Sequence, residues 1–419
     1  MISNVAILLF GAVFASTPCA GLKSVSLPNT TVMVAESVPA GTFTPPSGGQ
    51  RGGQPAALAV PAFCRVAAIL RPTPDSEIEM EVWLPENWNG KFQFVGGGGW
   101  AGVISYPAMA AALQEGYAAA STDTGHKGGN ASFAIGHPEK VVDFAYRAVH
   151  ETAVKSKAFI TAHYDRGARL SYWNGCSTGG RQGLMSAQRY PEDFDAILAG
   201  APANYQTHLH TWDLSVAVPV LKDPAAAVSQ AKAAALNKAV VTACDARDGV
   251  KDGLLNEPRS CKFDPSTLLC KAGDDPGCLT PPQLEAVKRM YSPAKTKTGE
   301  LIFPGKEPGS ETGWNAIAGG QAPAGVSLGS FQAAYDNLQW DWRTFDVDRD
   351  MKFVDEKVGF INAINPDLSA FKARGGKLIL YHGWNDTAIS PGNTINYYSS
   401  VLAKMGGKQD NWIRLFMAP

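Results

Sequence analysis

A serine set between glycines is the first feature of this chain whose residue types and spacing could support chemistry. Residues 174–182 read Asn-Gly-Cys-Ser-Thr-Gly-Gly-Arg-Gln, which puts Ser177 at the centre of a Gly-x-Ser-x-Gly motif. In many hydrolases this motif is a sharp turn between a strand and a helix that presents the serine hydroxyl to the substrate. A β-prone run, residues 169–173, precedes it, and a helical pattern, residues 183–190, follows it. The motif predicts a nucleophile, with an ordinary glycine- and serine-rich loop as the alternative.

A run of four glycines, residues 96–99, follows an apolar strand pattern at residues 91–95. Glycines allow a backbone to pass close to a ligand with its N–H groups pointing inward. We expect the N–H of Gly98 or Gly99 and the N–H of Thr178 to form an oxyanion hole, which typically stabilises a transition state by about 3–4 kcal/mol. The alternatives are a flexible surface loop and a phosphate-binding loop, and the latter lacks the Gly-Lys-Ser/Thr that it requires.

Asp386 is the residue expected to orient a catalytic histidine. It follows a strand predicted to begin near residue 375, which is where the acid of an α/β-hydrolase triad is found. A turn-forming aspartate is the alternative interpretation. The histidines are His126, His137, His150, His163, His208, His210 and His382. All of them precede Asp386, whereas the triad order is Ser, then Asp or Glu, then His, so no histidine occupies the expected place.

An acidic loop between two cysteines is the second candidate site. Its three aspartates are spaced by glycines, and hard cations such as Ca²⁺ prefer oxygen ligands of this kind. The expected calcium ligands are the side chains of Asp245, Asp248 and Asp252 and the backbone carbonyl oxygens of Val250 and Leu254. The spacing is not that of an EF-hand, and a solvated acidic turn is the alternative. No Cys/His pattern in the chain indicates zinc.

The chain has seven cysteines, an odd number. Two pairs are close enough in sequence to form local disulfides, and a third pair is possible if the first cysteine remains after processing. The expected disulfides are Cys244–Cys261, Cys270–Cys278 and Cys19–Cys64. This leaves Cys176, beside the candidate nucleophile, without a partner, which is unusual in an exported protein.

The apolar runs between residues 91 and 200 alternate with helical patterns, which predicts βαβ units and a mostly parallel sheet. Residues 77–84 alternate polar and apolar, which predicts a half-exposed antiparallel edge strand. From residue 203 to 360 this rhythm gives way to alanine-rich helices, cysteine pairs and turns. We therefore expect an α/β protein with an α/β-hydrolase fold, formed by residues 16–202 and 361–419, and a large inserted lid domain, residues 203–360, that carries the calcium loop.

The N-terminus and the overall charge bear on where the protein works. Residues 5–15 form an apolar run too short to cross a bilayer comfortably, which favours a secretory signal peptide at residues 1–15 over a buried first strand. The protein is then secreted or periplasmic, where disulfides persist. A net charge of -1 argues against a nucleic-acid or anionic-membrane partner. A small-molecule partner is what the family resemblance given next implies.

Taken in order, these motifs resemble the tannase and feruloyl esterase family. The resemblance rests on residues 96–99, 121–126, 175–182, 244–254 and 382–386. It implies a serine carboxylic-ester hydrolase that cleaves aromatic acid esters of the feruloyl, other hydroxycinnamoyl or galloyl type, or a terephthalate monoester, through an acyl-enzyme. It also implies Ser177 as nucleophile, Asp386 as triad acid and a structural Ca²⁺. We expect lid aromatic residues to stack on the ring of the acid; the candidates are Trp212, Trp314, Phe331, Trp340 and Trp342.

One segment of the family pattern has no counterpart in residues 1–419. In the family, the last strand leads into a Pro-Gly-x-x-His-Cys segment, whose histidine is the base and whose cysteine bonds to the cysteine preceding the nucleophile. We therefore expect residues 1–419 to be a C-terminally truncated fragment that is inactive as it stands. The rival is a chain that has lost its base, a non-catalytic aromatic-ester or glycan-binding relative. A peptidase is a weaker third interpretation.

Overall fold

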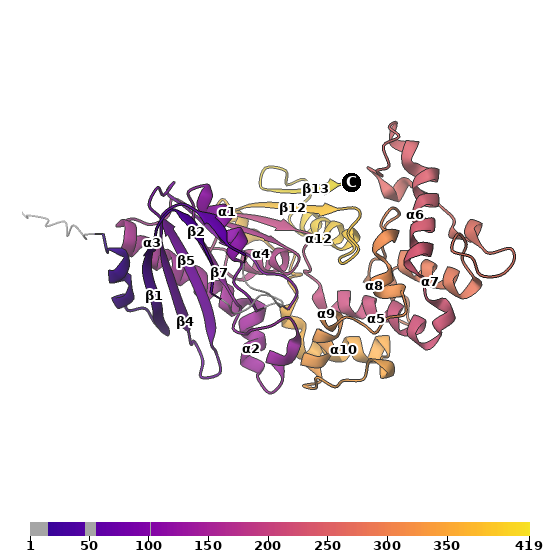
Figure 1. Cartoon of the computed structure of the whole chain (residues 1–419), viewed down its shortest axis with the longest axis horizontal. Helices are drawn as coiled ribbons and strands as arrows, with labels where there is room; N and C mark the ends of the chain where they lie inside the picture. Colours follow the sequence, from indigo (N-terminus) through magenta and orange to yellow (C-terminus); the bar gives the residue numbers. More distant parts are fainter. Residues whose placement is uncertain (1–15, 47–55, 101) are drawn as a thin grey trace, which may run out of the picture.

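A nine-stranded sheet forms the centre of the computed structural model, which describes residues 16–46, 56–100 and 102–419 (Figure 1). The expected signal peptide, residues 1–15, lies outside the described residues. The strands lie in the order β1-β4-β5-β7-β6-β8-β9-β12-β13. Their bounds are β1 Thr30–Val38, β4 Phe63–Leu70, β5 Ile78–Pro85, β6 Lys91–Val95, β7 Ala118–Thr122, β8 Leu170–Cys176, β9 Ala196–Gly200, β12 Lys377–Gly383 and β13 Ile413–Ala418. Two smaller ribbons pair β2 Gly41–Phe43 with β3 Leu58–Val60, and β10 Ala294–Lys295 with β11 Leu301–Phe303.

The sheet changes from antiparallel to parallel at β7. Strands β1, β4, β5 and β7 pair antiparallel, whereas all neighbours from β7 through β6, β8, β9 and β12 to β13 are parallel. This arrangement confirms the predicted α/β class. Because the carboxyl ends of parallel strands meet at one edge of a sheet, the segments that follow β6, β8 and β12 emerge close together. Those segments carry Gly99, Ser177 and Asp386.

The strand predicted at residues 77–84 is an interior strand, so the prediction of a half-exposed edge was wrong. β5 lies between β4 and β7, and nearly all of its residues are buried. Its Glu81 is only 2% exposed and accepts hydrogen bonds from Arg65 Nε on β4 and from the Tyr106 hydroxyl. The charged residue in the alternating pattern is therefore neutralised by a partner inside the sheet, and not by solvent.

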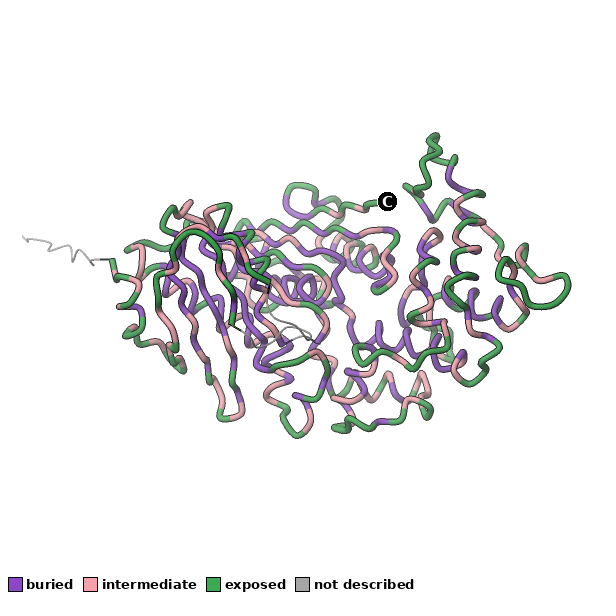
Figure 2. The backbone as a smooth tube through the Cα atoms, in the orientation of Figure 1, coloured by how far each residue is buried: buried purple, intermediate pink, exposed green. Residues whose placement is uncertain are grey.

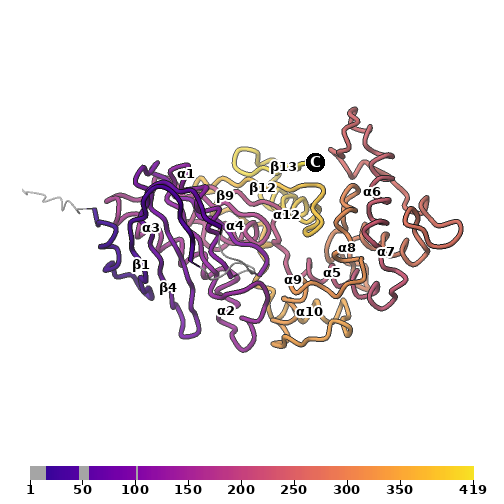
Figure 3. The backbone as a smooth tube through the Cα atoms, in the orientation of Figure 1, coloured from indigo at the N-terminus to yellow at the C-terminus, as the bar shows by residue number. Residues whose placement is uncertain are grey.

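Helices cover the sheet, and Figure 2 shows the buried backbone concentrated between them. The face formed by Phe92, Phe94 and Leu378 packs against α3, α4 and α12, while α1 packs over Trp83 on the other face. Figure 3 shows the last part of the chain, β12 to β13, placed beside β9. The helices of this part are α1 Tyr106–Gln114, α2 Pro138–Val142, η3 Asp143–Arg147, α3 Ala148–Tyr164, α4 Thr178–Arg189, α11 Ser369–Ala373 and α12 Pro391–Lys404.

The segment after β9 folds into helices that lie outside the sheet. They are α5 Gln206–Lys222, α6 Gln230–Cys244, α7 Pro281–Tyr291, α8 Asn315–Ala318, α9 Gly325–Ala334 and α10 Val347–Val358. One apolar cluster, around Trp212 and Trp314, lies mostly within this segment. A second cluster joins Phe331 of α9 to Trp100 and Phe144 of the sheet domain. Among the described residues, no helix is long and apolar enough to cross a membrane.

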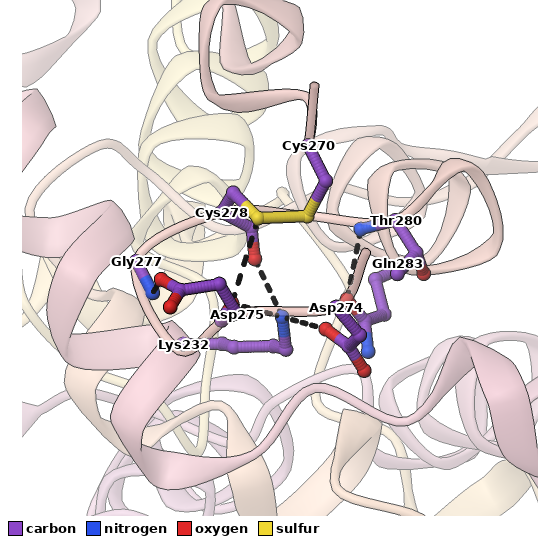
Figure 4. The surroundings of a disulfide bond; sticks show 8 residues. All are labelled: Lys232, Cys270, Asp274, Asp275, Gly277, Cys278, Thr280 and Gln283. Atoms are coloured by element: carbon purple, nitrogen blue, oxygen red, sulfur yellow. Dashed lines mark hydrogen bonds and ion pairs between the residues drawn. A yellow bond between two sulfur atoms is a disulfide. The ribbon is translucent and has the colours of Figure 1, made fainter. Parts of the chain in front are cut away.

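The structure confirms all three predicted disulfides, which are Cys19–Cys64, Cys244–Cys261 and Cys270–Cys278. Figure 4 shows the surroundings of the last of these. Lys232 of α6 is almost fully buried there, and its ammonium group donates to the carbonyl oxygens of Asp275 (2.7 Å) and Cys278 (2.6 Å). The ammonium group also pairs with the carboxylate of Asp274. The bridge closes the loop on itself, and the buried ammonium group of Lys232 fastens α6 to that loop.

Candidate active site

The turn that carries Ser177 joins β8 to α4. Ser177 has φ 61° and ψ -120°, a combination that residues with a side chain rarely adopt. Its N–H donates to the carbonyl oxygen of Gly200 on β9 (3.0 Å), and its own carbonyl oxygen accepts from the N–H of Arg181 (3.1 Å). These bonds hold a strained residue at the carboxyl end of a parallel strand, which is the arrangement of a nucleophile elbow.

A cavity of about 230 Å³ lies beside this turn and is lined by Ser177. Its lining is mostly aliphatic and includes Leu209, Ala217, Ile317, Pro323, Val326 and Ile389. The lid aromatic residues expected to stack on a substrate ring do not line it, so that expectation was wrong. Trp212, Trp314 and Phe331 are instead fully buried in the apolar clusters of the lid segment, because a segment of short helices needs large side chains for its own core.

The glycine loop is held against the start of α4. Thr178 Oγ1 donates to the carbonyl oxygen of Gly99 (2.8 Å), and the N–H of Gly97 donates to Gln182 Oε1 (3.1 Å). Gly99 and Thr178 line the cavity together with the nucleophile, whereas Gly98 is exposed and is not part of the lining. Of the two glycines considered as oxyanion donors, Gly99 is therefore the one placed at the cavity.

Asp386 lies in the loop between β12 and α12. Its Oδ1 accepts from the N–H groups of Ala388 (2.8 Å) and Ile389 (2.9 Å), and its Oδ2 is 3.2 Å from His382 Nε2. Burial opposes ionisation of this carboxyl, but the hydrogen bonds outweigh it and lower the pKa of Asp386. Burial and the charge of Asp386 together raise the pKa of the Cys176 thiol. Cys176 forms no disulfide with any described residue.

The described residues show no histidine that joins Ser177 to Asp386. His382 is fully buried, with Nδ1 2.7 Å from Thr394 Oγ1, so it supports Asp386 from inside the fold. His210 lines the cavity with Ser177, but its Nδ1 is 2.8 Å from the hydroxyl of Ser330, and burial lowers its pKa to about 3. Ser177 and Asp386, the expected nucleophile and acid, therefore lie at one edge of the sheet, and no histidine among the described residues contacts both.

A polar stripe on α5 was not predicted from the sequence. Gln206, His210 and Asp213 occupy positions i, i+4 and i+7 of this helix, so they share one face, and all three line the cavity. Gln206 Oε1 and Asp213 Oδ1 are buried without a hydrogen-bond partner among the described residues. The available signal for this face was the helical spacing of Gln206, His210 and Asp213, but other polar residues of the same helix, such as Thr207 and His208, obscured it.

The predicted calcium loop folds around Asp245. This residue is 6% exposed, and its Oδ1 accepts from the N–H groups of Asp252 (3.2 Å) and Gly253 (2.9 Å). Asp248 Oδ1 accepts from the N–H of Val250 (3.0 Å). The donor atoms available here are all oxygens, which is the chemistry that Ca²⁺ prefers. The three aspartate carboxylates hydrogen-bond to the loop's own backbone and are not gathered around a common point.

One other group of ligand-type side chains lies together in the described part of the chain. Ligand atoms of His150, Glu192 and Asp193 all lie within 4.8 Å of one another. His150 Nδ1 is 2.9 Å from Asp193 Oδ2, and its ring stacks on Tyr190. Burial opposes protonation of this histidine, but the contact with Asp193 outweighs it and raises the pKa of His150. The group therefore contains an ion pair that accounts for its contacts.

A mixed sheet with a serine at a strand-to-helix elbow defines the α/β-hydrolase class. Within this class, the chain belongs to the tannase and feruloyl esterase family, whose profile matches residues 64–419. It is 39% identical over 442 residues to an uncharacterized esterase of Xanthomonas campestris pv. campestris, a match that covers 97% of this chain and 76% of that protein. It is 34% identical over 395 residues to probable feruloyl esterase B of Aspergillus clavatus, covering 93% and 75%.

Solved structures also match this chain, and a feruloyl esterase is among them. The crystal structure of feruloyl esterase B from Aspergillus oryzae matches with a TM-score of 0.89 and 32% identity, covering 94% of this chain and 80% of that one. Tannin acyl hydrolase from Aspergillus niger matches with a TM-score of 0.76 and 22% identity, covering 97% and 80%, which shows a shared fold. The predicted family and the predicted α/β-hydrolase fold are confirmed.

Proposed function

We propose that this chain is a serine carboxylic-ester hydrolase for esters of aromatic acids, of the hydroxycinnamoyl (feruloyl) or galloyl type. The observation that carries the proposal is Ser177, held at φ 61° beside a largely aliphatic cavity of about 230 Å³. A cavity of this kind favours the ring of an aromatic acid. The names of the Aspergillus relatives support the same substrate class.

In the proposed reaction, Ser177 Oγ attacks the ester carbonyl while its proton passes to a base. The carbonyl oxygen becomes an oxyanion that accepts hydrogen bonds from the N–H groups of Thr178 and Gly99, the one of the two candidate glycines that lines the cavity. The intermediate collapses to acyl-Ser177 and an alcohol, which takes the proton back from the base. Water then attacks the acyl group in the same way and releases the acid.

Asp386 would orient the base and stabilise its positive charge during both steps. The base in such enzymes is a histidine that follows the acid in sequence, and residues 387–419 contain no histidine. The proposal therefore assigns the nucleophile, the acid and the oxyanion donors to this chain and names none of its described residues as the base.

Hydrolysis of a small ester panel tests the substrate class. Methyl ferulate, methyl gallate and a terephthalate monoester would be incubated with the protein in the presence of imidazole, which can act as an external base. We expect release of ferulate or gallate that depends on Ser177 and disappears in Ser177→Ala. If the folded protein releases no acid from any of the three esters in a Ser177-dependent manner, the proposal is rejected.

A non-catalytic protein that binds aromatic esters or glycans is the second candidate. The specific observation that favours it is that no histidine hydrogen-bonds to Ser177 within the described residues. Binding of methyl ferulate by calorimetry, without imidazole-dependent hydrolysis, would support this candidate over the esterase.

We also propose that the loop between Cys244 and Cys261 holds a structural Ca²⁺. The ligands would be the carboxylates of Asp245, Asp248 and Asp252 and the carbonyl oxygens of Val250 and Leu254. When bound, the cation would offset two of the three negative charges that the aspartates place on one short loop of the lid. The all-oxygen donor set of this short, disulfide-closed loop supports the proposal. Binding would require the carboxylates to turn from the loop's own N–H groups toward the cation.

Calcium is expected to raise the melting temperature of the protein by several degrees over its value in EGTA. A ligand present at 100 times its Kd stabilises the folded state by about 2.7 kcal/mol, which is enough to produce such a shift. Differential scanning calorimetry should show that Asp248→Asn reduces the shift. Asp264→Asn, which changes an exposed aspartate of a neighbouring lid turn, should retain it. Equal melting temperatures of the wild-type protein in Ca²⁺ and in EGTA would contradict the proposal.

Export is proposed for the same protein. The apolar run at residues 5–15 and the three disulfides support a secreted or periplasmic location, because disulfides persist mainly in oxidising compartments. Mass spectrometry of the mature N-terminus should then give Ser16 as the first residue. A mature chain that retains residues 1–15 would contradict processing at this point.

A further inference from the structure

A carboxylate in the cavity wall has chemistry that the proposed reaction does not use. Asp213 on α5 is 9% exposed and lines the cavity together with Ser177. Its Oδ2 accepts a hydrogen bond from the hydroxyl of Ser327 (2.7 Å), which also lines the cavity. Its Oδ1 has no partner among the described residues. A buried carboxylate oxygen without a donor is costly, so the cavity lacks a hydrogen-bond donor at this point.

Lys306 is the cation that accompanies Asp213, but it is engaged elsewhere. Its ammonium group donates to the carbonyl oxygen of Ala388 (3.1 Å) and lies 4.8 Å from the centre of the Trp212 ring. Burial raises the pKa of Asp213 to about 6, while the charge of Lys306 and the hydroxyl of Ser327 oppose this rise. At neutral pH the side chain is therefore mostly a carboxylate, which can only accept hydrogen bonds.

The position of Asp213 along α5 relates it to the nucleophile. The N–H of Ala203 donates to the carbonyl oxygen of Ser177 (3.1 Å), which places the chain just before α5 at the elbow. Gln206 begins the helix, and Asp213 lies seven residues further on, or roughly 10 Å along the axis at 1.5 Å per residue. A substrate with its carbonyl at Ser177 would direct the far end of its acid part along this helix. In a ring-hydroxylated acid, that end carries a phenolic O–H.

We propose that Asp213 accepts a hydrogen bond from a phenolic hydroxyl of the acid part of the substrate, and that the cavity thereby selects ring-hydroxylated acids. The inference rests on the proposed function, because it assigns the acid part of the ester to this cavity. An O–H to carboxylate hydrogen bond is short and strong. A site that buries a polar group also discriminates against ligands that leave the group without a partner. Asp213 is thus a specificity residue that does not take part in bond cleavage.

Binding of two neutral esters to a variant without the nucleophile tests the inference. Calorimetry on Ser177→Ala would compare methyl 4-hydroxycinnamate with methyl cinnamate, which differ only in the phenolic hydroxyl. We expect at least about tenfold tighter binding of the hydroxylated ester. In Ser177→Ala/Asp213→Leu this ratio should fall to about one. In Ser177→Ala/Asp213→Asn, which retains the shape of the side chain but not its charge, the ratio should fall several-fold.

Asp355→Asn in the same Ser177→Ala background is the matched control. Asp355 contacts α5 through Thr207 and His208 but does not line the cavity, so its variant should keep the full ratio. If the Asp213→Leu variant does not fold, the Asp213→Asn variant decides. An unchanged ratio in the folded Asp213 variants, or equal binding of the two esters before Asp213 is changed, would overturn the inference.

The two proposals fail in different ways. If the ester panel shows no Ser177-dependent hydrolysis but the hydroxylated ester binds through Asp213, the esterase is rejected and the phenol site stands. If the panel is hydrolysed but the binding ratio does not depend on Asp213, the esterase stands and the phenol site is rejected.

Discussion

A polypeptide of residues 16–419 is expected to hydrolyse methyl ferulate about 10⁴-fold or more slowly than a serine esterase with a complete triad. It is also expected to gain rate when imidazole is added. The reason is that no histidine hydrogen-bonds to Ser177 among the described residues, although Asp386, the proposed acid, follows β12 at the same edge of the sheet. Triad residues act as a unit, so a nucleophile and an acid without a base retain only the contributions of the oxyanion hole and of substrate binding.

Stopped-flow or discontinuous assays of ferulate release, with imidazole at several concentrations, provide the measurement. Ser177→Ala should abolish the imidazole-dependent rate. Ser186→Ala is the matched control, since this serine lies on the same helix, is buried and does not line the cavity. Full activity without imidazole would contradict the prediction and would direct attention to His210, the histidine that lines the cavity with Ser177. In that case His210→Gln should remove the activity.

The parts of the fold that were predicted correctly depend on short-range signals. The strand ending at Cys176, the helix starting at Thr178 and the parallel strands on either side follow from apolar runs and glycine positions alone. The strand containing Glu81 was misplaced because its charge is paired with Arg65, which comes from another strand. A local pattern cannot distinguish a glutamate that faces water from one that faces a buried arginine.

In the candidate site too, the residues predicted correctly are those that short-range signals identify. Ser177 and Asp386 could be chosen from the segments in which they lie, because an elbow and a loop after a strand are local features. Gln206 and Asp213 were not recognised, because their importance depends on which surface α5 turns toward Ser177. That orientation is set by packing between α5 and distant segments such as α9 and α10.

His382 illustrates a further limit of sequence order. His382 precedes Asp386, whereas the base of an α/β-hydrolase follows the acid, so the sequence order argued against His382 as the base. The order indicated no other role for it. In the structure, its ring lies in the core, 3.2 Å from Asp386 and 2.7 Å from Thr394, so it fixes the loop that carries the acid. A histidine near a site can therefore support the acid without reaching the nucleophile.

Gly175→Ala is expected to destabilise the protein by about 3 kcal/mol, at the upper end of the usual cost of overpacking a buried site. A Cβ atom at this position would lie 2.7 Å from the backbone carbonyl group of Gly179 and 2.8 Å from its Cα atom. These are backbone atoms of the first turn of α4, so no side-chain rotation can relieve the contact. Gly179 is itself confined by the glycine loop, because its own Cβ position is 3.1 Å from the carbonyl oxygen of Gly97. The methyl group would therefore push α4 and Ser177 away from the strand.

Urea denaturation followed by circular dichroism measures this effect, and Gly98→Ala is its matched control. Gly98 is exposed, no atom lies within 4 Å of its Cβ position, and its φ angle is not positive. We expect its variant to lie within about 0.5 kcal/mol of the wild-type protein. Because alanine keeps the backbone N–H, Gly98→Ala should also leave binding of methyl ferulate nearly unchanged, whereas Gly175→Ala should weaken it by displacing the elbow. If both variants proved equally stable, α4 would not be packed against β8 through glycine contacts, and the position of Ser177 would need another explanation.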